Sequence, residues 1–112
     1  MKVSFEGIGE QVISFANASA DAGDLVKMSA GGTVAPCSAG DDFMGVCVQA
    51  DTAFAEVKTA GYIECGYTDT APSVGFGILV ASTTGKVKTA LSGREHLIIK
   101  VDTTNSVVGF ML

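Results

Sequence analysis

The sequence predicts an all-β fold: a single compact β-barrel or β-sandwich of short strands with an extended N-terminal arm. Short runs alternate apolar with polar residues, as in Glu56–Lys58 and Leu97–Asp102, and such alternation places one face of a strand against a core. Glycine-bearing turn segments separate these runs, and patterns that indicate a helix are almost absent. Many short strands separated by turns are typical of sandwiches and barrels.

The length and composition suit one folded domain. The chain has 112 residues, of which 47% are hydrophobic and 17% charged, so it has enough apolar groups to build a core. We expect residues 1–22 to form an N-terminal arm and linker and residues 23–112 to form the β-barrel domain. Residues 10–15 have an alternative interpretation, as one more core strand. No internal repeat stands out.

Turn formers divide the barrel region into a series of expected strands. Their ranges are 24–28, 33–37, 43–50, 54–59, 61–67, 76–81, 85–89, 96–103 and 106–112. The last two form a hairpin around Asn105 and Ser106. The apolar run Val107–Leu112 is expected to pair inside the sheet, so its removal should unfold the protein.

The charge pattern excludes several kinds of partner. The formal net charge is -5, and the lysine and acidic residues are scattered singly or in pairs. Because no basic face exists to neutralise phosphates, nucleic-acid binding is not expected. No apolar run approaches the roughly 20 residues that span a bilayer, and the N-terminus lacks the apolar centre of a secretory signal. We therefore expect a protein made in the cytoplasm, with no membrane partner.

The residues that could carry chemistry form no recognisable catalytic or metal-binding pattern. Cys37, Cys47 and Cys65 are widely spaced and are expected to be free thiols, or to pair later in an extracellular particle. The single histidine, His96, precedes an apolar strand and is interpreted as a strand-edge residue. The Asp41–Asp42 pair is interpreted as part of a solvated turn. No enzyme activity, metal or cofactor is predicted; a small β-barrel enzyme or ligand-binding protein is the alternative.

Several short segments spread over residues 22–112 carry a resemblance to a known group of proteins. They are Ala22–Lys27, Phe43–Val48, Lys58–Glu64, Ala71–Gly75, Gly85–Lys88, Ile99–Asp102 and Val107–Leu112. In this order they are similar to segments of the tailed-phage capsid decoration (cement) proteins, including the small proteins encoded beside capsid genes and the lambda-type head decoration proteins.

The resemblance implies a structural virion protein that is made in the host cytoplasm and stabilises the outer surface of an HK97-type capsid. Its partner would be the major capsid protein, and it would act as a homo-trimer or as symmetric copies. In several such proteins an N-terminal arm becomes ordered on the capsid. The candidate capsid contacts are the apolar residues of the expected arm: Val3, Phe5, Ile8, Val12, Ile13 and Phe15. A head-fibre or tail-associated virion module is an alternative role.

Overall fold

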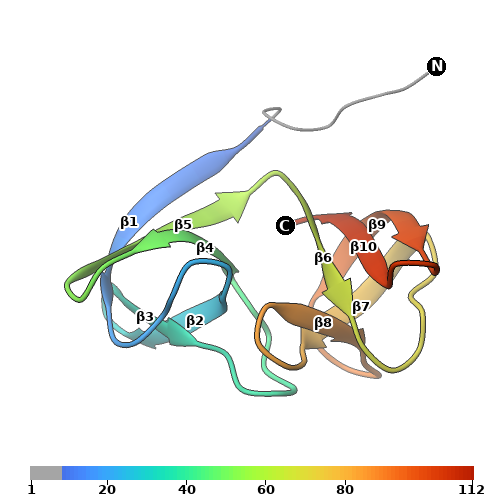
Figure 1. Cartoon of the computed structure of the whole chain (residues 1–112), viewed down its shortest axis with the longest axis horizontal. Helices are drawn as coiled ribbons and strands as arrows, with labels where there is room; N and C mark the ends of the chain where they lie inside the picture. The colour runs from blue at the N-terminus through green and yellow to red at the C-terminus, as the bar shows by residue number, and fades with distance from the viewer. Residues whose placement is uncertain (1–8) are drawn as a thin grey trace.

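The computed structural model describes residues 9–112, and in this range the chain forms ten β-strands and no helix (Figure 1). The predicted all-β fold of short strands is confirmed. The strands are β1 (Gln11–Asn17), β2 (Leu25–Ala30), β3 (Thr33–Pro36), β4 (Gly45–Ala50), β5 (Phe54–Ala60), β6 (Tyr62–Tyr67), β7 (Gly75–Ala81), β8 (Lys86–Thr89), β9 (Glu95–Asp102) and β10 (Val107–Met111). Every strand expected from residue 24 onward is present, with its ends placed to within about two residues.

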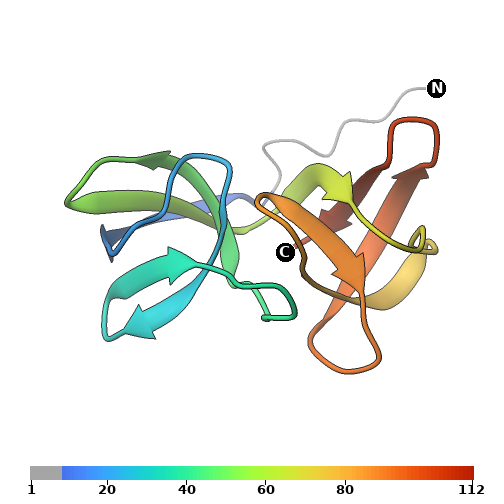
Figure 2. The ribbon, with the colours of Figure 1, turned by 60° about the horizontal axis from the view of Figure 1, so that its bottom comes forward.

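The strands close into two barrels that lie side by side, where the sequence pattern predicts one (Figure 2). The strand order is β1-β3-β2-β4-β5 in the first barrel and β10-β6-β8-β7-β9 in the second. The chain completes the first barrel before it begins the second, and only Gly61 separates β5 from β6. Gly61 has a φ of 107°, a left-handed conformation that glycine adopts without steric cost. The connection between the barrels is therefore short and sharply turned.

Both barrels have the same topology. In the first, β1 pairs parallel with β3 and antiparallel with β5; in the second, β6 pairs parallel with β8 and antiparallel with β10. Strands β2 and β7 each lie between two antiparallel neighbours, β3 and β4 in one case and β8 and β9 in the other. Matching strands recur after about 50 residues. The fold thus contains an internal repeat that sequence inspection does not find.

Strand registers identify equivalent residues, which make the same cross-strand pair in the two barrels. Such matches are Ile13–Val57 with Ile63–Phe110, Met28–Val34 with Ala81–Val87, and Leu25–Val46 with Phe76–Leu97. Along β2 and β7, the residues matched through the neighbours β3 and β8 differ by one full pleat, which is two residues, from those matched through the neighbours β4 and β9. A shift of a full pleat keeps each side chain on its face of the sheet, so inward residues match inward residues.

Each barrel has its own core. The first core consists of Ala20, Val26, Val34, Cys47, Ala55 and Val57. The second is larger and consists of Leu25, Phe43, Ile63, Tyr67, Leu79, Ala81, Val87, Ile98, Val108 and Phe110. Leu25 and Phe43 belong to the first half of the chain, so the second core is completed by side chains that the first barrel supplies.

Residues 11–17, which fall within the predicted arm and linker, form β1 of the first barrel. The alternative interpretation of residues 10–15 as one more strand describes them. β1 pairs with β5 along its length and with β3 at its end. The turn that follows is fixed by Asn17, whose Nδ2 donates to the carbonyl oxygen of Ala20 (2.9 Å) while its Oδ1 accepts from the Ala20 N–H (2.8 Å). Residues 1–8 of the predicted arm lie outside the described residues.

Candidate protein-contact surfaces

The segment between β3 and β4, residues 37–44, attaches the first barrel to the end of the second; we term it the plug segment. The Gly40 N–H donates to the Ala81 carbonyl oxygen (2.8 Å), and the Ala81 N–H donates to the Asp41 carbonyl oxygen (2.9 Å). The backbone N–H of Arg94, just before β9, donates to Asp42 Oδ1 (3.1 Å). The segment is thus hydrogen-bonded to two parts of the second barrel.

Phe43 fills the end of the second barrel. Its ring stacks on His96, with centroids 4.9 Å apart and planes 8° apart, and meets Phe110 edge-on at 5.8 Å. Both Phe43 and His96 are buried. Because aromatic side chains bury large areas and gain further from edge-on packing, this contact joins the barrels firmly.

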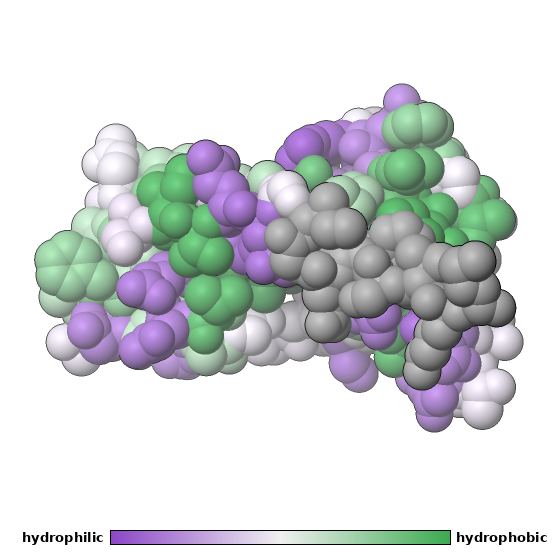
Figure 3. Space-filling model, turned by 90° about the horizontal axis from the view of Figure 1, so that it is seen from above, coloured by the Kyte–Doolittle hydropathy of each residue, from purple (hydrophilic) through white to green (hydrophobic). Residues whose placement is uncertain are grey.

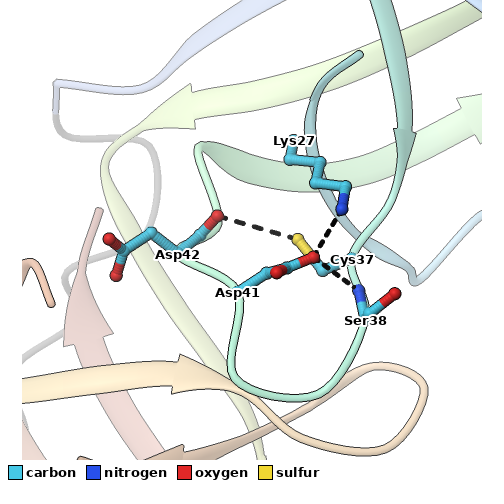
Figure 4. A network of polar contacts seen from close by, with 5 residues as sticks. All are labelled: Lys27, Cys37, Ser38, Asp41 and Asp42. Atoms are coloured by element: carbon cyan, nitrogen blue, oxygen red, sulfur yellow. Dashed lines mark hydrogen bonds and ion pairs between the residues drawn. The ribbon is translucent and has the colours of Figure 1, made fainter.

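Polar contacts fix the shape of the plug segment (Figure 4). Asp41 Oδ2 accepts from Lys27 Nζ at 2.6 Å and from the Ser38 N–H at 2.8 Å. The bond from Lys27 is the main cause that lowers the pKa of Asp41, and the same bond raises the pKa of Lys27. Burial raises the pKa of the nearby Cys37 thiol to about 11. Asp41 and Asp42 therefore lie in a turn that is open to solvent, as predicted, and both also accept hydrogen bonds that fix its shape.

His96 lies near the start of β9, but its side chain lies inside the barrel and not at a strand edge. Its Nδ1 is 3.0 Å from the Met111 carbonyl oxygen, which can only accept, so Nδ1 carries the proton. The other ring nitrogen, Nε2, is buried and has no hydrogen-bond partner among the described residues. Burial lowers the pKa of His96, while the bond to Met111 acts in the opposite direction. A neutral ring held between Phe43 and Phe110 suits a packing role.

Three of the six predicted contact residues are on β1, and the others, Val3, Phe5 and Ile8, lie outside the described residues. Val12 is 50% exposed and Ile13 is 39% exposed. Phe15 is partly buried and packs against the core of the first barrel. On β1, Val12 and Ile13 therefore expose more apolar surface than Phe15 does.

The outer face of the first barrel continues from β1 toward the second barrel. Val12 on β1 pairs with Lys58 on β5, which in turn pairs with Val46 on β4, so the three side chains form one cross-strand row. Val46 also lines an open groove of about 520 Å³ between the barrels; its other lining residues are Glu10, Val48, Lys58, Tyr62, Ile63 and Glu64.

Lys58 lies across this groove. Its Nζ donates to Glu10 Oε1 and to the Tyr62 carbonyl oxygen, both at 2.7 Å. The lining thus combines apolar side chains with the paired charges of Lys58 and Glu10.

Further apolar side chains reach the surface of both barrels (Figure 3). The exposed large apolar residues outside the predicted contact set are Met28, Val48, Phe54, Val74, Phe76, Leu91 and Leu97. Phe76 and Leu97 lie opposite each other on β7 and β9 and are 76% and 39% exposed. Phe76 lies between two glycines, and Leu97 begins the apolar run Leu97-Ile98-Ile99 in which Ile98 is buried, so no local signal marks either residue as exposed.

Within residues 9–112, no group of three or more His, Cys, Asp or Glu side chains is placed to hold a metal ion. The same part of the chain contains no helix long and apolar enough to cross a membrane. The three cysteines are free thiols; Cys47 is buried, and Cys37 and Cys65 are partly buried.

Comparison with known proteins adds no relative. A scan against protein-family models, a search of curated proteins and a search of solved structures each found no match to this chain. The surfaces of the two barrels are therefore interpreted from their own geometry and from the resemblance of the sequence segments.

Proposed function

We propose that this protein is a structural virion protein that binds the outer surface of an HK97-type phage capsid and stabilises it. The resemblance to decoration proteins suggests this role, and the major capsid protein is its partner. The observation that carries the proposal is the exposure of Val12 and Ile13, apolar side chains of the predicted contact set, on a strand that pairs with β3 and β5 of the first barrel.

The pairing of β1 supports a contact at this strand. Among the described residues, β1 pairs with β3 only at Ala16 and Asn17, whereas its pairing with β5 begins at Gln11. One edge of the first half of β1 is therefore available to an extended segment of a capsid subunit. A strand added there gains main-chain hydrogen bonds and contacts with Val12 and Ile13.

The energies indicate that many contacts act together. Full burial of a Val or Ile side chain contributes about 1.5–3 kcal/mol, so the exposed halves of Val12 and Ile13 contribute about 1 kcal/mol each. Association costs an estimated 4–15 kcal/mol in lost freedom of motion. We therefore expect Val3, Phe5 and Ile8 to add contacts, and symmetric copies on one particle to gain avidity.

Deletion of residues 2–8 tests the proposal. Because β1 begins at Gln11, this deletion spares every described strand, whereas a deletion through residue 15 would remove most of β1. We expect the shortened protein to keep the unfolding temperature of the full chain and to lose co-sedimentation with expanded capsids of its virus.

The double variant Val12→Ser/Ile13→Ser should also bind capsids more weakly, while Phe54→Ser, at a 61% exposed position of the same barrel, should bind as the wild type does. Capsid binding that survives both the deletion and the double variant would refute the proposal. Electron microscopy of decorated particles adds a second readout, because density at one vertex or on the tail would favour a head-fibre or tail-associated module.

A further inference from the structure

We propose that copies of this protein associate head to tail, by repeating between molecules the contact that joins the two barrels within one molecule. The proposal goes beyond the role on capsids and does not depend on it. It rests on the shared topology of the barrels and on which equivalent residues are covered in one barrel and exposed in the other.

Within the molecule, the first barrel contributes an outward-facing pair from β2 and β4, Leu25 and Val46. Leu25 is 4% exposed and belongs to the core of the second barrel, and Val46 packs against the same core. On the second barrel, Ala81 lines a cavity together with Leu25, and Ile63 lines a groove together with Val46. We term Leu25 and Val46 the donor side of this contact and Ile63 and Ala81 its acceptor side.

The second barrel carries its own donor side. Phe76 and Leu97 on β7 and β9 are equivalent to Leu25 and Val46, because the same strands of the repeat pair in the same way. Phe76 is 76% exposed and Leu97 is 39% exposed, whereas Leu25 is 4% exposed. Leu91, in the segment between β8 and β9 that matches the plug segment, is fully exposed as well. These three apolar side chains are at the surface.

The first barrel carries the matching acceptor side. Ile13 and Met28 are equivalent to Ile63 and Ala81 by strand register. Ile63 and Ala81 are covered, with exposures of 9% and 2%, while Ile13 and Met28 are 39% and 46% exposed. The molecule therefore offers both halves of one apolar contact, an acceptor on the first barrel and a donor on the second.

A second copy of the chain is the partner that fits both sides at once. Within one molecule, the donor side formed by β2 and β4 of the first barrel packs against the acceptor side of the second barrel. The two barrels share one topology, so the equivalent surfaces of two copies can pack in the same way. A contact between the donor of one copy and the acceptor of the next is heterologous, so it builds a closed ring or an open chain, depending on the rotation it imposes.

The contact between copies is weaker than the one within a molecule. The pair Cys47–Val57 in the first barrel matches the pair Ile98–Phe110 in the second. Counting back from these pairs, Arg94 occupies the position equivalent to Phe43, and Gly45 occupies the position equivalent to His96. The aromatic plug is thus absent from the contact between copies. We expect reversible, concentration-dependent association.

Two variants separate the donor from the acceptor. Phe76→Ser/Leu97→Ser disables the donor side, Ile13→Ser/Met28→Ser disables the acceptor side, and Phe54→Ser is the control at another exposed phenylalanine. Sedimentation velocity over a series of concentrations should give wild type and the control an average mass that rises above that of a dimer. Each double variant alone should stay monomeric, with association weakened about tenfold or more.

The mixture of the two double variants is the decisive sample. Each partner retains one working side, so the mixture should form a dimer and nothing larger. A monomeric wild type at all concentrations, or a mixture that stays monomeric, would overturn the proposal. A donor variant that still dimerises alone would also overturn it, because it indicates a symmetric contact. Circular dichroism checks that each variant is folded, and the single changes Phe76→Ser and Met28→Ser replace any double variant that is not.

Discussion

The two barrels share one strand plan and have different interiors. Within residues 9–112, all six buried core residues of the first barrel are Ala, Val or Cys, whereas the core of the second includes Phe43, Tyr67 and Phe110. Where the second barrel holds the His96 ring, the first has Gly45. The first barrel is filled by its own residues, while the second needs Leu25 and Phe43 from the other half of the chain. One topology can therefore be packed as a small core made of its own residues or as a larger, shared one.

Close approach of the backbone takes the place of large side chains in the first barrel. A Cβ atom at Gly45 would collide with the Lys58 carbonyl oxygen on the neighbouring strand β5. In the second barrel, a Cβ atom at Gly109 would collide with the Tyr62 hydroxyl, because the Tyr62 ring lies over β10 there. Glycine thus allows backbone contact in one barrel and aromatic packing in the other.

Removal of Val107–Leu112 should have the largest effect. β10 pairs with both β6 and β9, and Val108 and Phe110 are fully buried, so the second barrel loses its closure and part of its core. Among residues 9–112, the first barrel alone keeps a core of six buried residues, and we expect this core to be too small to remain folded. We expect no cooperative thermal transition in circular dichroism. A cooperative transition with about half the β signal would instead mean that the first barrel folds by itself.

Removal of the plug ring should have the next largest effect. Phe43→Ala deletes a ring that is 2% exposed, and we expect it to lower the free energy of unfolding by about 3–5 kcal/mol in urea titrations. Phe54→Ala removes the same ring at a 61% exposed position and should change that free energy by about 0.5 kcal/mol or less. Equal effects of the two changes would mean that the plug does not join the barrels.

A pH effect specific to the second barrel should be smaller. The pKa of His96 in the folded protein lies below its ordinary value of 6.5, mainly because of burial; the bond to Met111 raises it, the charge of Arg94 lowers it and that of Asp42 raises it. Below pH 6.5 the unfolded chain therefore binds a proton that the folded protein does not, and stability falls as the pH falls, by at most about 1.4 kcal/mol per pH unit. Well above pH 6.5 the imidazole is neutral in the unfolded chain as well, so His96 contributes no pH dependence there.

Urea midpoints between pH 5 and pH 7 measure this effect, and His96→Gln should flatten the profile. The chain has one histidine, so its imidazole signals in a nuclear magnetic resonance titration need no assignment. Phe43→Ala should raise the pKa of His96 toward its ordinary value by admitting water. A wild-type profile as flat as that of His96→Gln would contradict the neutral, buried ring.

Local sequence signals located the strands but not the division into barrels. Glycine-bearing turns and alternation identify β2 through β10, and the hairpin around Asn105 is present, with Asp102 Oδ1 accepting from the Thr104 and Asn105 N–H groups. The closing contacts are the parallel pairs β1–β3 and β6–β8, which join strands that are not neighbours in sequence. No local sequence pattern encodes these parallel pairs, so the sequence predicts an arm where β1 forms.

The repeat and the exposed surfaces were hidden for related reasons. Equivalent positions hold different side chains, such as Val57 and Phe110, because each barrel balances its own volumes. The apolar character of Val12 and Ile13 predicts them as contacts and both are exposed, but Phe76 and Leu97 are as apolar as their buried neighbours Ile98 and Leu79. Whether such a residue is buried depends on what packs on its strand from outside, and only the three-dimensional arrangement gives that.

The core of the second barrel can be completed only late in translation, because it combines side chains from both halves of the chain. Leu25 and Phe43 leave the ribosome well before Phe110, the last large side chain of the core that they enter. Until β10 has emerged, the nascent first half of the chain exposes both side chains to solvent and to neighbouring nascent chains. We therefore expect slow or interrupted elongation after residue 60 to favour aggregation, and rapid completion of the second half to protect against it.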